Sequence, residues 1–477
     1  MSPTSDPRRL RALSIALVSA LACQGEARDR AAPTPAPVEP SASAPTKIAP
    51  CADHRELDLA ALPPLPAGRF TATLEQVWRT VLEKHYDPTL GCVDWPALRL
   101  EYGQKLASVD DPQAAYALMN QLLGELGQSH FRVYGPGAES DADVRGPARV
   151  PIQVRLIDGQ VVVVNGALDG HESGVPPGAV ITKVDDRELA PLIAATRAGA
   201  SREGEADALA SRKIANALSG PVDAARVITY LAPNGDAAVT RTVLCVEPDA
   251  EKLSLGNLRD LPTRVDARVL PGTKIGYLAF NFWMLPMVEK VEQAVAGLRA
   301  EGVTAMILDL RGNPGGVGAM VVPIGRLFLR DPASLGTMRF RDFELSFNVA
   351  ENPDAFTGPL VLLVDEGTAS TSEIFAVGMR DLGRVTIVGA RPSAGAALPS
   401  LIERLDGGAL LQYVVSDYTS PKGAAAEGRG IDPDVRVPES RDDYIAGRDP
   451  VLAAAIARVH EVEDAQLAPE REGVPKP

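Results

Sequence analysis

The spacing of hydrophobic residues divides the chain into a helical part and a β-rich part that follows it. From Phe70 to about Tyr134, apolar residues recur every three or four positions, as on one face of a helix: Leu74, Val77, Trp78, Val81, Leu82, Tyr116, Met119, Leu122, Leu123 and Leu126. From about Pro147 the period changes to two, because Ile152 to Leu156 alternates and Val161 to Val164 is a β-branched run. The pattern predicts a small helical domain followed by a β-rich domain.

The last large segment alternates between strand and helix patterns. Four apolar runs predict strands at Ile275 to Phe282, Thr304 to Leu310, Pro359 to Val364 and Arg384 to Gly389, with helices after the first and third. Nearly continuous apolar runs are typical of strands buried on both faces, so the segment predicts a parallel α/β layer. Ligand sites in such layers lie beyond the carboxyl ends of the strands. Two loops occupy such positions, at Arg311 to Gly318 and at Glu366 to Thr371.

Composition and charge narrow the classes of partner. The chain has 477 residues, 45% of them hydrophobic, and a net charge of −14 with no block of Lys or Arg beyond the first dozen residues. This balance argues against nucleic acid as a partner, since such partners need a positive surface. The four cysteines form no CxxC pair and the five histidines no HExxH motif, so no zinc-site spacing is present. We expect no metal and no cofactor.

The first residues predict export. Arg8, Arg9 and Arg11 precede an apolar stretch from Ala12 to Ala22 that is too short for a mature membrane span, so residues 1–22 are interpreted as a signal peptide. The following Cys23 leaves two interpretations: a lipidated cysteine that anchors the protein to a membrane, or a residue next to an ordinary cleavage site. A Pro-, Ala- and Ser-rich segment then predicts an extended tether within residues 23–69. We expect a periplasmic or cell-envelope protein.

Three further cysteines would meet oxidising conditions outside the cytosol. Cys51 and Cys92 bracket the first folded segment, so we expect them to form a disulfide. Cys245 lies in a strand pattern and is expected to be a buried thiol.

The two loops of the α/β layer carry the candidate chemistry. The glycine loop lacks both the Gly-Lys-Ser/Thr of a P-loop and the third glycine of a dinucleotide fingerprint, so nucleotide binding is not favoured. Its backbone N–H groups can instead stabilise the oxyanion of an acyl intermediate. Ser370, between a buried strand and a helix, is then the candidate nucleophile. Helix capping is the alternative for this serine, since Glu373 follows it at the spacing of a capping box.

Three stretches carry a family resemblance. Ile307-Leu-Asp-Leu-Arg-Gly-Asn-Pro-Gly-Gly316, Val364-Asp-Glu-Gly-Thr-Ala-Ser-Thr-Ser-Glu-Ile374 and Glu427-Gly-Arg-Gly-Ile-Asp-Pro-Asp434 resemble the signature stretches of the C-terminal processing (tail-specific) peptidases and their tricorn-core relatives. The resemblance covers most of residues 70 to 440. It implies a serine peptidase that acts on unfolded or C-terminal protein segments, with Ser370 at the nucleophile position.

The resemblance also implies the architecture. We expect an α/β protein with a crotonase-like (ClpP/crotonase) spiral ββα core, an N-terminal helical domain and a PDZ-like β-rich domain. The expected units are a signal peptide (1–22), a tether and N-terminal lead (23–69), the helical domain (70–147), the PDZ-like domain (148–250), the catalytic core (251–440), and a terminal helix with a disordered tail (441–477).

One departure from the family pattern selects the branch. Tail-specific peptidases use a Ser-Lys dyad, whereas this chain reads Ser393-Ala-Gly-Ala396 where the lysine is expected. The chain instead resembles the tricorn-type branch, which uses a Ser-His-Glu arrangement with a Ser-His dipeptide in the helical domain. Ser129 and His130 match that dipeptide. The resemblance therefore implies that Ser370 is the nucleophile and His130 the base. Glu427 is the carboxylate that orients the base, and Ser129 supplies a supporting hydroxyl. The oxyanion donors are backbone N–H groups of Gly315, Gly316 and Thr371. The choice between the two glycines stays open.

The remaining expectations concern the binding partners and the residues without a catalytic role. The substrate is a peptide or an unfolded protein, the PDZ-like segment holds a peptide end, and the oligomeric state is left open. The alternative function is a non-catalytic ligand- or peptide-binding protein on the same fold. Structural or solvent-exposed roles are expected for His54, His85, His171, His460, Lys422, Asp381 and Asp309, the last pairing with Arg311 or with backbone N–H groups.

Overall fold

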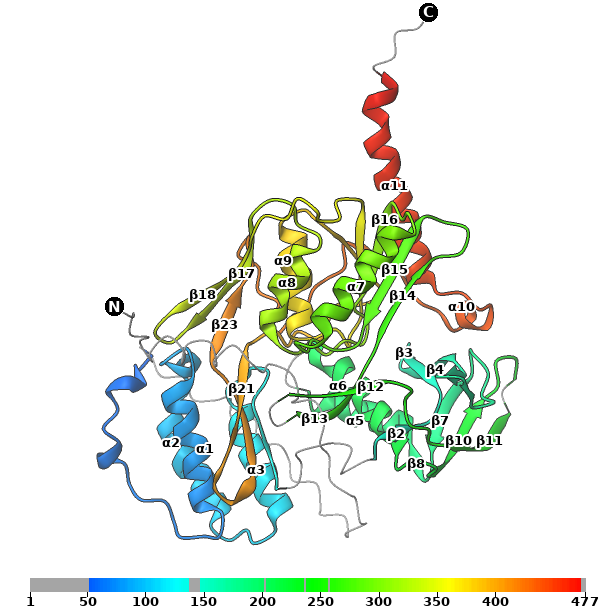
Figure 1. Cartoon of the computed structure of the whole chain (residues 1–477). Helices are drawn as coiled ribbons and strands as arrows, with labels where there is room; N and C mark the ends of the chain where they lie inside the picture. The colour runs from blue at the N-terminus through cyan, green and yellow to red at the C-terminus, as the bar shows by residue number, and fades with distance from the viewer. Residues whose placement is uncertain (1–50, 137–145, 201–202, 236, 256–257, 473–477) are drawn as a thin grey trace, which may run out of the picture.

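The computed structural model describes residues 51–136, 146–200, 203–235, 237–255 and 258–472. In Figure 1 the helical part lies at the lower left, the β-rich part at the lower right, and the α/β part above both. The expected signal peptide, the Pro-rich tether before Cys51 and the candidate lipidation site Cys23 lie outside the described residues.

Three helices form the helical part: α1 (Thr71–Lys84), α2 (Trp95–Leu106) and α3 (Pro112–Gly124). Both later helices begin at an aspartate N-cap, with Asp94 and Asp111 accepting hydrogen bonds from backbone N–H groups three residues on. Two fully buried tryptophans join α1 to α2, because each indole N–H donates to the other's carbonyl: Trp78 to Trp95 at 2.8 Å and Trp95 to Trp78 at 3.1 Å. Two hydrogen bonds within an apolar core therefore fix α1 against α2.

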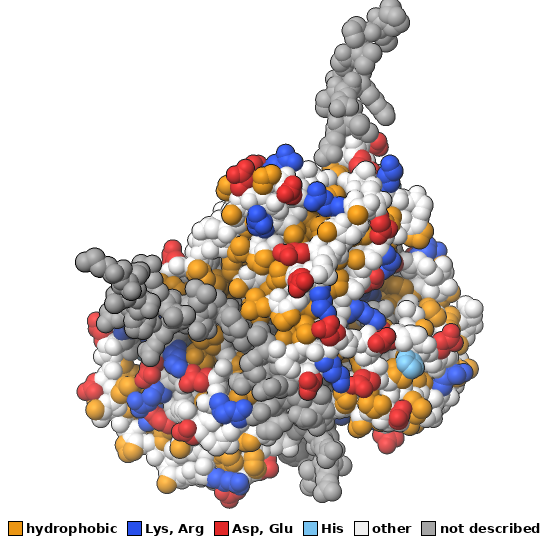
Figure 2. Space-filling model, in the orientation of Figure 1, with side chains coloured by type: hydrophobic (Ala, Val, Ile, Leu, Met, Phe, Trp, Pro, Cys, Tyr) orange, Lys and Arg blue, Asp and Glu red, His pale blue; other side chains and the backbone are white. Residues whose placement is uncertain are grey.

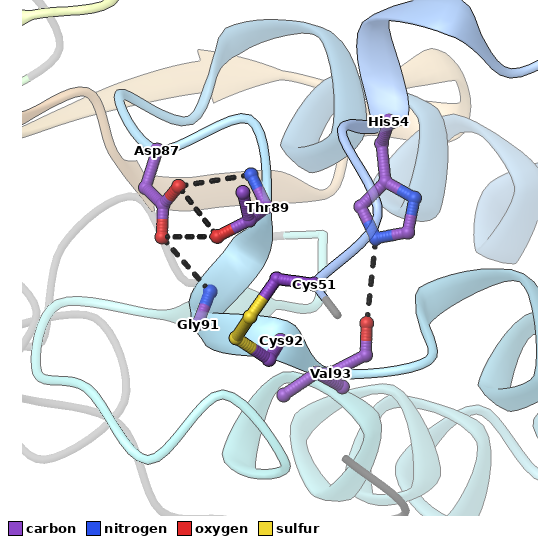
Figure 3. The surroundings of a disulfide bond; sticks show 7 residues. All are labelled: Cys51, His54, Asp87, Thr89, Gly91, Cys92 and Val93. Atoms are coloured by element: carbon purple, nitrogen blue, oxygen red, sulfur yellow. Dashed lines mark hydrogen bonds between the residues drawn. A yellow bond between two sulfur atoms is a disulfide. The ribbon is translucent and has the colours of Figure 1, made fainter. Parts of the chain in front are cut away.

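A disulfide joins Cys51 to Cys92, the pair expected from their positions (Figure 3). His54 follows on the same segment, and its Nε2 lies 3.3 Å from the carbonyl oxygen of Val93. The chain before α1 is thus fixed to the loop between α1 and α2. Cys245 is a free, buried thiol that follows the last residue of a strand.

Removing the disulfide is expected to destabilise the protein. The bridge closes a loop of 41 residues, and the loss of chain entropy in the unfolded state predicts a stabilisation of about 4 kcal/mol. The pair Cys51→Ser/Cys92→Ser should therefore unfold at a clearly lower denaturant concentration, measured by circular dichroism. Cys245→Ala, which replaces a cysteine outside the disulfide, is the control variant. An unchanged midpoint in the double variant would contradict the expectation.

The β-rich part has a sheet of its own. Its strand order is β11-β10-β7-β4-β3, and β8 pairs with β7. The main strands are β3 (Gln153–Ile157), β4 (Gln160–Asn165), β7 (Val180–Val184), β8 (Arg187–Glu188), β10 (Ala225–Leu231) and β11 (Ala238–Leu244), accompanied by helices α5 (Leu189–Ala198) and α6 (Glu203–Ala217). Most buried side chains of this part, from Ala148 to Cys245, form a hydrophobic cluster of their own, and Ile157, Val162 and Val180 form a smaller one with Tyr444. The alternating pattern found in the sequence corresponds to this sheet.

Charged contacts join the β-rich part to the α/β part. Arg155 on β3 donates to Asp365 Oδ2 at 2.9 Å and lies 3.4 Å from Glu439 Oε1. Asp207 on α6 pairs with Arg391 at 3.2 Å. Asp365 lies five residues before Ser370, so these contacts reach the segment that carries the candidate nucleophile.

The α/β part is built on a six-stranded sheet of order β14-β15-β16-β19-β20-β24. The four pairings from β15 to β24 are parallel, which confirms the predicted parallel layer, and β14 adds an antiparallel edge. The strands are β14 (Val265–Val269), β15 (Ile275–Phe280), β16 (Ala305–Asp309), β19 (Leu360–Val364), β20 (Thr386–Gly389) and β24 (Val435–Arg436). Helices α7 (Met287–Ala300), α8 (Val321–Arg326) and α9 (Thr371–Asp381) lie on one side in Figure 1, and α11 (Pro450–Glu472) packs on the other.

The terminal helix is longer than the sequence predicted. The sequence predicted a helix followed by a disordered tail within residues 441–477, but α11 continues to Glu472. Apart from Pro469, the residues of its last two turns (AQLAPERE, 465–472) have high helix propensity, so polarity alone is a poor guide to disorder.

A second sheet ties the helical part to the α/β part. Strand β1 (Arg132–Tyr134) follows the helices and pairs with β22 (Leu410–Val414), which pairs with β21 (Ser400–Arg404). Figure 1 shows this hairpin reaching down beside α1. The two parts also share one hydrophobic cluster, which runs from Phe70 through Val133 to Ile431. The helical domain is therefore not an independent unit, and the turn before β1 is brought to the α/β part.

The fold also includes a third sheet and a hairpin. The third sheet contains β18 (Glu344–Val349), β17 (Ala333–Phe340) and β23 (Ser416–Thr419), and the hairpin joins β12 (Glu251–Leu255) to β13 (Leu258–Thr263). On the face shown in Figure 2, Lys and Arg are interspersed with Asp and Glu. Among the described residues, no helix is both long and apolar enough to cross a membrane.

Candidate active site

Ser370 lies in a strained turn between β19 and α9. It is the N-cap residue of α9, as the capping interpretation expected, and its backbone has φ 55° and ψ −121°. Few non-glycine residues adopt this conformation, and such strain is concentrated at functional sites. The residue is 1% exposed, so it lies in the interior and not at the surface. The helix N-terminus directs partial positive charge towards this serine.

Glu373 holds the serine's turn in place. Its carboxylate accepts hydrogen bonds from Ser393 Oγ (2.6 Å) and from the N–H groups of Gly395 (2.9 Å), Ala396 (2.9 Å) and Ser370 (3.0 Å). Complete burial raises the pKa of Glu373 to about 7, and the Glu427 charge adds to this effect, whereas the hydrogen bonds act in the opposite direction. The ionised form matches four donors, so the network is best satisfied above about pH 7.

The glycine loop lies directly against the serine. A Cβ at Gly315 would lie 2.7 Å from Ser370 Cβ and 2.9 Å from the Thr371 nitrogen, which excludes any larger residue. The N–H of Gly315 donates to Asn313 Oδ1 at 3.0 Å. The carbonyl of Gly316 accepts from Thr371 Oγ1 at 2.8 Å, so the two loops are tied together. Gly315 thus uses its N–H within the loop, which makes Gly316 the preferred candidate of the two for an oxyanion donor.

Thr371 supplies a second backbone donor beside the serine. It is the first residue of α9, and the N–H groups of a first helical turn have no acceptor within the helix. Thr371 and Gly316, which are joined by the bond from the Thr371 hydroxyl to the Gly316 carbonyl, are the candidates for the two donors that oxyanion stabilisation uses.

Ser129, His130 and Glu427 are also in contact. Ser129 Oγ lies 2.7 Å from His130 Nδ1 and donates to Glu427 Oε2 at 2.8 Å, and the Ser129 N–H donates to Glu427 Oε1 at 2.7 Å. His130 has φ 61°, a second strained non-glycine backbone. The contacts run from the carboxylate through the hydroxyl to the imidazole, so the hydroxyl is placed between the expected orienting carboxylate and the base.

Two consecutive residues link this group to the serine. Ala396 accepts from the Ser370 N–H at 2.8 Å, and the next residue, Ala397, donates its N–H to Glu427 Oε2 at 2.9 Å. The alanine pair occupies the segment in which the Ser-Lys branch would carry its lysine. The same backbone thus contacts both halves of the site.

The other singled-out residues have structural contacts. Asp309 accepts from Arg311 and from the Tyr277 hydroxyl, which confirms its expected pairing. Asp381 accepts from Ser420 and from the N–H of Lys422, whose side chain is exposed.

His85 has the expected structural role, and its position next to the site is specific. It follows α1 as the C-cap, is fully buried, and its Nε2 lies 2.9 Å from Gln128 Oε1. Its ring also stacks on Phe131, so it contacts both residues that flank Ser129 and His130. Burial lowers the pKa of His85, which favours the neutral imidazole.

Sequence reasoning missed the residues that support the site. Asn313, Ser393 and Ala397 make their contacts through backbone atoms or short side chains, and such contacts leave no periodic signal in a sequence. Glu373 was visible as a capping residue, but not as the acceptor of donors from a loop twenty residues away.

A buried, strained serine at a helix N-terminus, beside backbone donors and a histidine–serine–glutamate set, has the parts of a serine hydrolase. Comparison with known proteins agrees with this class. Residues 274–437 match the model of peptidase family S41, and residues 66–124 match the Tricorn protease C1 domain.

Relatives cover most of the chain. A carboxyl-terminal-processing protease of Synechocystis is 26% identical over 368 residues, which is 76% of this chain and 79% of the relative. Carboxyl-terminal-processing peptidase 3, chloroplastic, of Arabidopsis thaliana is 27% identical over 378 residues, which is 76% of this chain and 68% of the relative. The chain therefore carries an S41 peptidase domain and a Tricorn C1 domain, and it is a serine-type hydrolase.

Solved structures support the same fold. The photosystem II D1 C-terminal processing protease aligns with a TM-score of 0.53 and 22% identity, covering 78% of this chain and 94% of that protein. Mature CPAF aligns with a TM-score of 0.56 and 14% identity, covering 85% of this chain and 98% of that protein. At these identities the likeness concerns the fold.

Proposed function

We propose that this protein is an exported serine peptidase that cleaves unfolded or C-terminal protein segments through a Ser-His-Glu arrangement. The observation that carries the proposal is the chain of contacts that runs from Ser370 through Ala396 and Ala397 to Glu427, Ser129 and His130. In the proposed mechanism, Ser370 is the nucleophile and His130 is the base.

The contacts of Ser129 support one tautomer of the base. Its hydroxyl donates to Glu427, so its oxygen is left to accept a hydrogen bond from Nδ1–H of His130. The unprotonated Nε2 then takes the proton from Ser370 Oγ as that oxygen attacks the scissile carbonyl carbon. The resulting oxyanion accepts from the N–H groups of Gly316 and Thr371. The imidazolium next protonates the leaving amine, and water hydrolyses the acyl-enzyme by the same groups in reverse.

The rest of the chain supplies substrate binding and location in this proposal. The α/β part is a crotonase-like spiral core, and the β-rich part is a PDZ-like domain that holds a peptide end at a sheet edge. The apolar N-terminal stretch directs export, and Cys23, if lipidated, tethers the protein to the cell envelope.

The test is labelling of the purified, folded protein with a fluorophosphonate probe. We expect one adduct, located on Ser370 by peptide mass spectrometry, because only an activated serine attacks this phosphorus centre. Ser370→Ala should abolish labelling. Ser346→Ala, which changes a serine on β18, is the matched control and should label like the unmodified protein.

One observation favours the alternative function, a non-catalytic peptide-binding protein. Ser370 is only 1% exposed, so a ligand would reach it only after the surroundings move. If folded protein is not labelled, either alone or with denatured casein present as a peptide source, the peptidase proposal fails and the binding function is favoured.

A further inference from the structure

Trp283 is a buried residue that contacts both loops of the oxyanion site. It follows β15, has no exposed surface, and packs its ring against Phe280 (centroids 4.9 Å apart) and Phe375 (5.2 Å). Its backbone pairs with the glycine loop: its N–H donates to the Gly315 carbonyl at 2.9 Å, and its own carbonyl accepts from Val317 at 2.7 Å. These two bonds flank Gly316 on both sides.

The close approach explains why Gly316 is a glycine. Its φ is 150°, and a Cβ built on it would fall 2.0 Å from the carbonyl oxygen of Trp283. The peptide plane that carries the Gly316 N–H is thus fixed by the backbone of Trp283, because residues 315 and 317 are both paired to it.

The indole reaches the other loop. Its Nε1–H donates to Ser372 Oγ at 2.8 Å, and this hydroxyl donates to the Asn313 carbonyl at 3.1 Å. The same carbonyl accepts from the Ala369 N–H at 3.1 Å. One tryptophan therefore connects the glycine loop, through its backbone, with the first turn of α9, through its side chain.

We propose that Trp283 is a positioning residue for the oxyanion site: it fixes the distance between the Gly316 and Thr371 N–H groups by binding both loops. The inference rests on the proposed function, since it concerns the stabilisation of the same acyl intermediate. A residue with this role affects the transition state, where the oxyanion exists, more than the binding of the ground-state peptide.

The test compares Trp283→Phe with a matched variant elsewhere. Trp283→Phe keeps an aromatic ring between Phe280 and Phe375 but removes the donor to Ser372. Trp78→Phe is the control, because Trp78 is equally buried and its indole N–H also donates one 2.8 Å hydrogen bond, in the helical part. Both variants lose one buried hydrogen bond, so a general loss of stability should affect them alike.

We expect Trp283→Phe to lower kcat for a fluorogenic peptide, and the rate of fluorophosphonate labelling, by about 10- to 100-fold, since small displacements of catalytic groups have effects of this size. KM should change less than twofold and the shape of the pH profile should not change, because the base is intact. Trp78→Phe should keep kcat within twofold at a temperature where both variants are folded.

A second variant guards against failure of Trp283→Phe to fold. Ser372→Ala interrupts the same connection from the α9 side and is expected to lower kcat similarly, with the double variant no worse than either single one. Labelling of Ser370 at the unmodified rate in Ser372→Ala or Trp283→Phe would overturn the inference. Absence of labelling in the unmodified protein would instead overturn the proposed function, so the two failures are distinguishable.

Discussion

Replacing His130 with Ala is expected to lower kcat/KM for peptide hydrolysis by about 10³-fold, since general-base catalysis contributes roughly 10²–10⁴-fold. Ser370 would then have to lose its proton to water. Backbone donors at Gly316 and Thr371 are untouched by this change, so some activity above the uncatalysed rate should remain. Initial rates with a fluorogenic peptide from pH 5 to 9 measure the effect.

The pH profile separates the imidazole from Glu373. In the unmodified protein activity should fall with decreasing pH, because an imidazole that is already protonated cannot accept a proton. In His130→Ala the remaining activity should still fall as the pH drops through about 7. Burial raises the pKa of Glu373 to that value, and its protonated form cannot accept all four donors around Ser370.

The control for this prediction is a histidine outside the site. His171 lies on β6 (His171–Glu172) with an exposed side chain, so His171→Ala should keep both the rate and the pH profile. Equal rates for His130→Ala and the unmodified protein would show that another group accepts the proton of Ser370, and the Ser-His-Glu proposal would be wrong.

The parallel layer and its loops could be predicted from the sequence because each strand is a short apolar run. The runs at Ala305–Asp309 and Leu360–Val364 are buried along their whole length, and the residues that follow them meet at one edge of the sheet. Ser370 and the glycine loop were therefore expected to lie close together. They do, because a Cβ placed on Gly315 would lie only 2.7 Å from Ser370 Cβ.

The contacts across the domains could not be predicted from periodicity. Ser129 and Glu427 are separated by 298 positions, and only the family resemblance placed them in one site. Their approach depends on the pairing of β1 with β22, two strands whose patterns give no indication of partner or register. The same holds for Trp283, whose side chain reads as an ordinary core residue although its N–H and backbone bind two loops.

The missing lysine has a physical counterpart in the structure. At the corresponding position, Ala396 contributes only backbone groups: its carbonyl accepts from Ser370 and its N–H donates to Glu373. A lysine there would carry a charge next to the buried carboxylate of Glu373. In the proposed mechanism this segment supports the nucleophile, and His130, in the turn before β1, accepts the proton.

Glu427→Gln and Ser129→Ala are expected to show strong non-additivity. Each single change should lower kcat/KM by about 10²–10³-fold, because loss of the orienting group of a catalytic histidine costs up to roughly 10⁴-fold. The double variant should be no slower than Ser129→Ala alone. The physical reason is that, in the proposed mechanism, the 2.8 Å bond to the Ser129 hydroxyl is the contact through which Glu427 fixes the Nδ1–H tautomer of His130.

A double-mutant cycle on kcat/KM measures this coupling, with Ser129→Thr as a variant that keeps the hydroxyl and should retain more activity than Ser129→Ala. If Glu427 instead acts on the imidazole by a route that does not need the hydroxyl, Glu427→Gln would cost the same factor in the Ser129→Ala background as in the unmodified protein. Full coupling would mean that Ser129 is a necessary member of the catalytic group, because the carboxylate then acts on the base only through its hydroxyl.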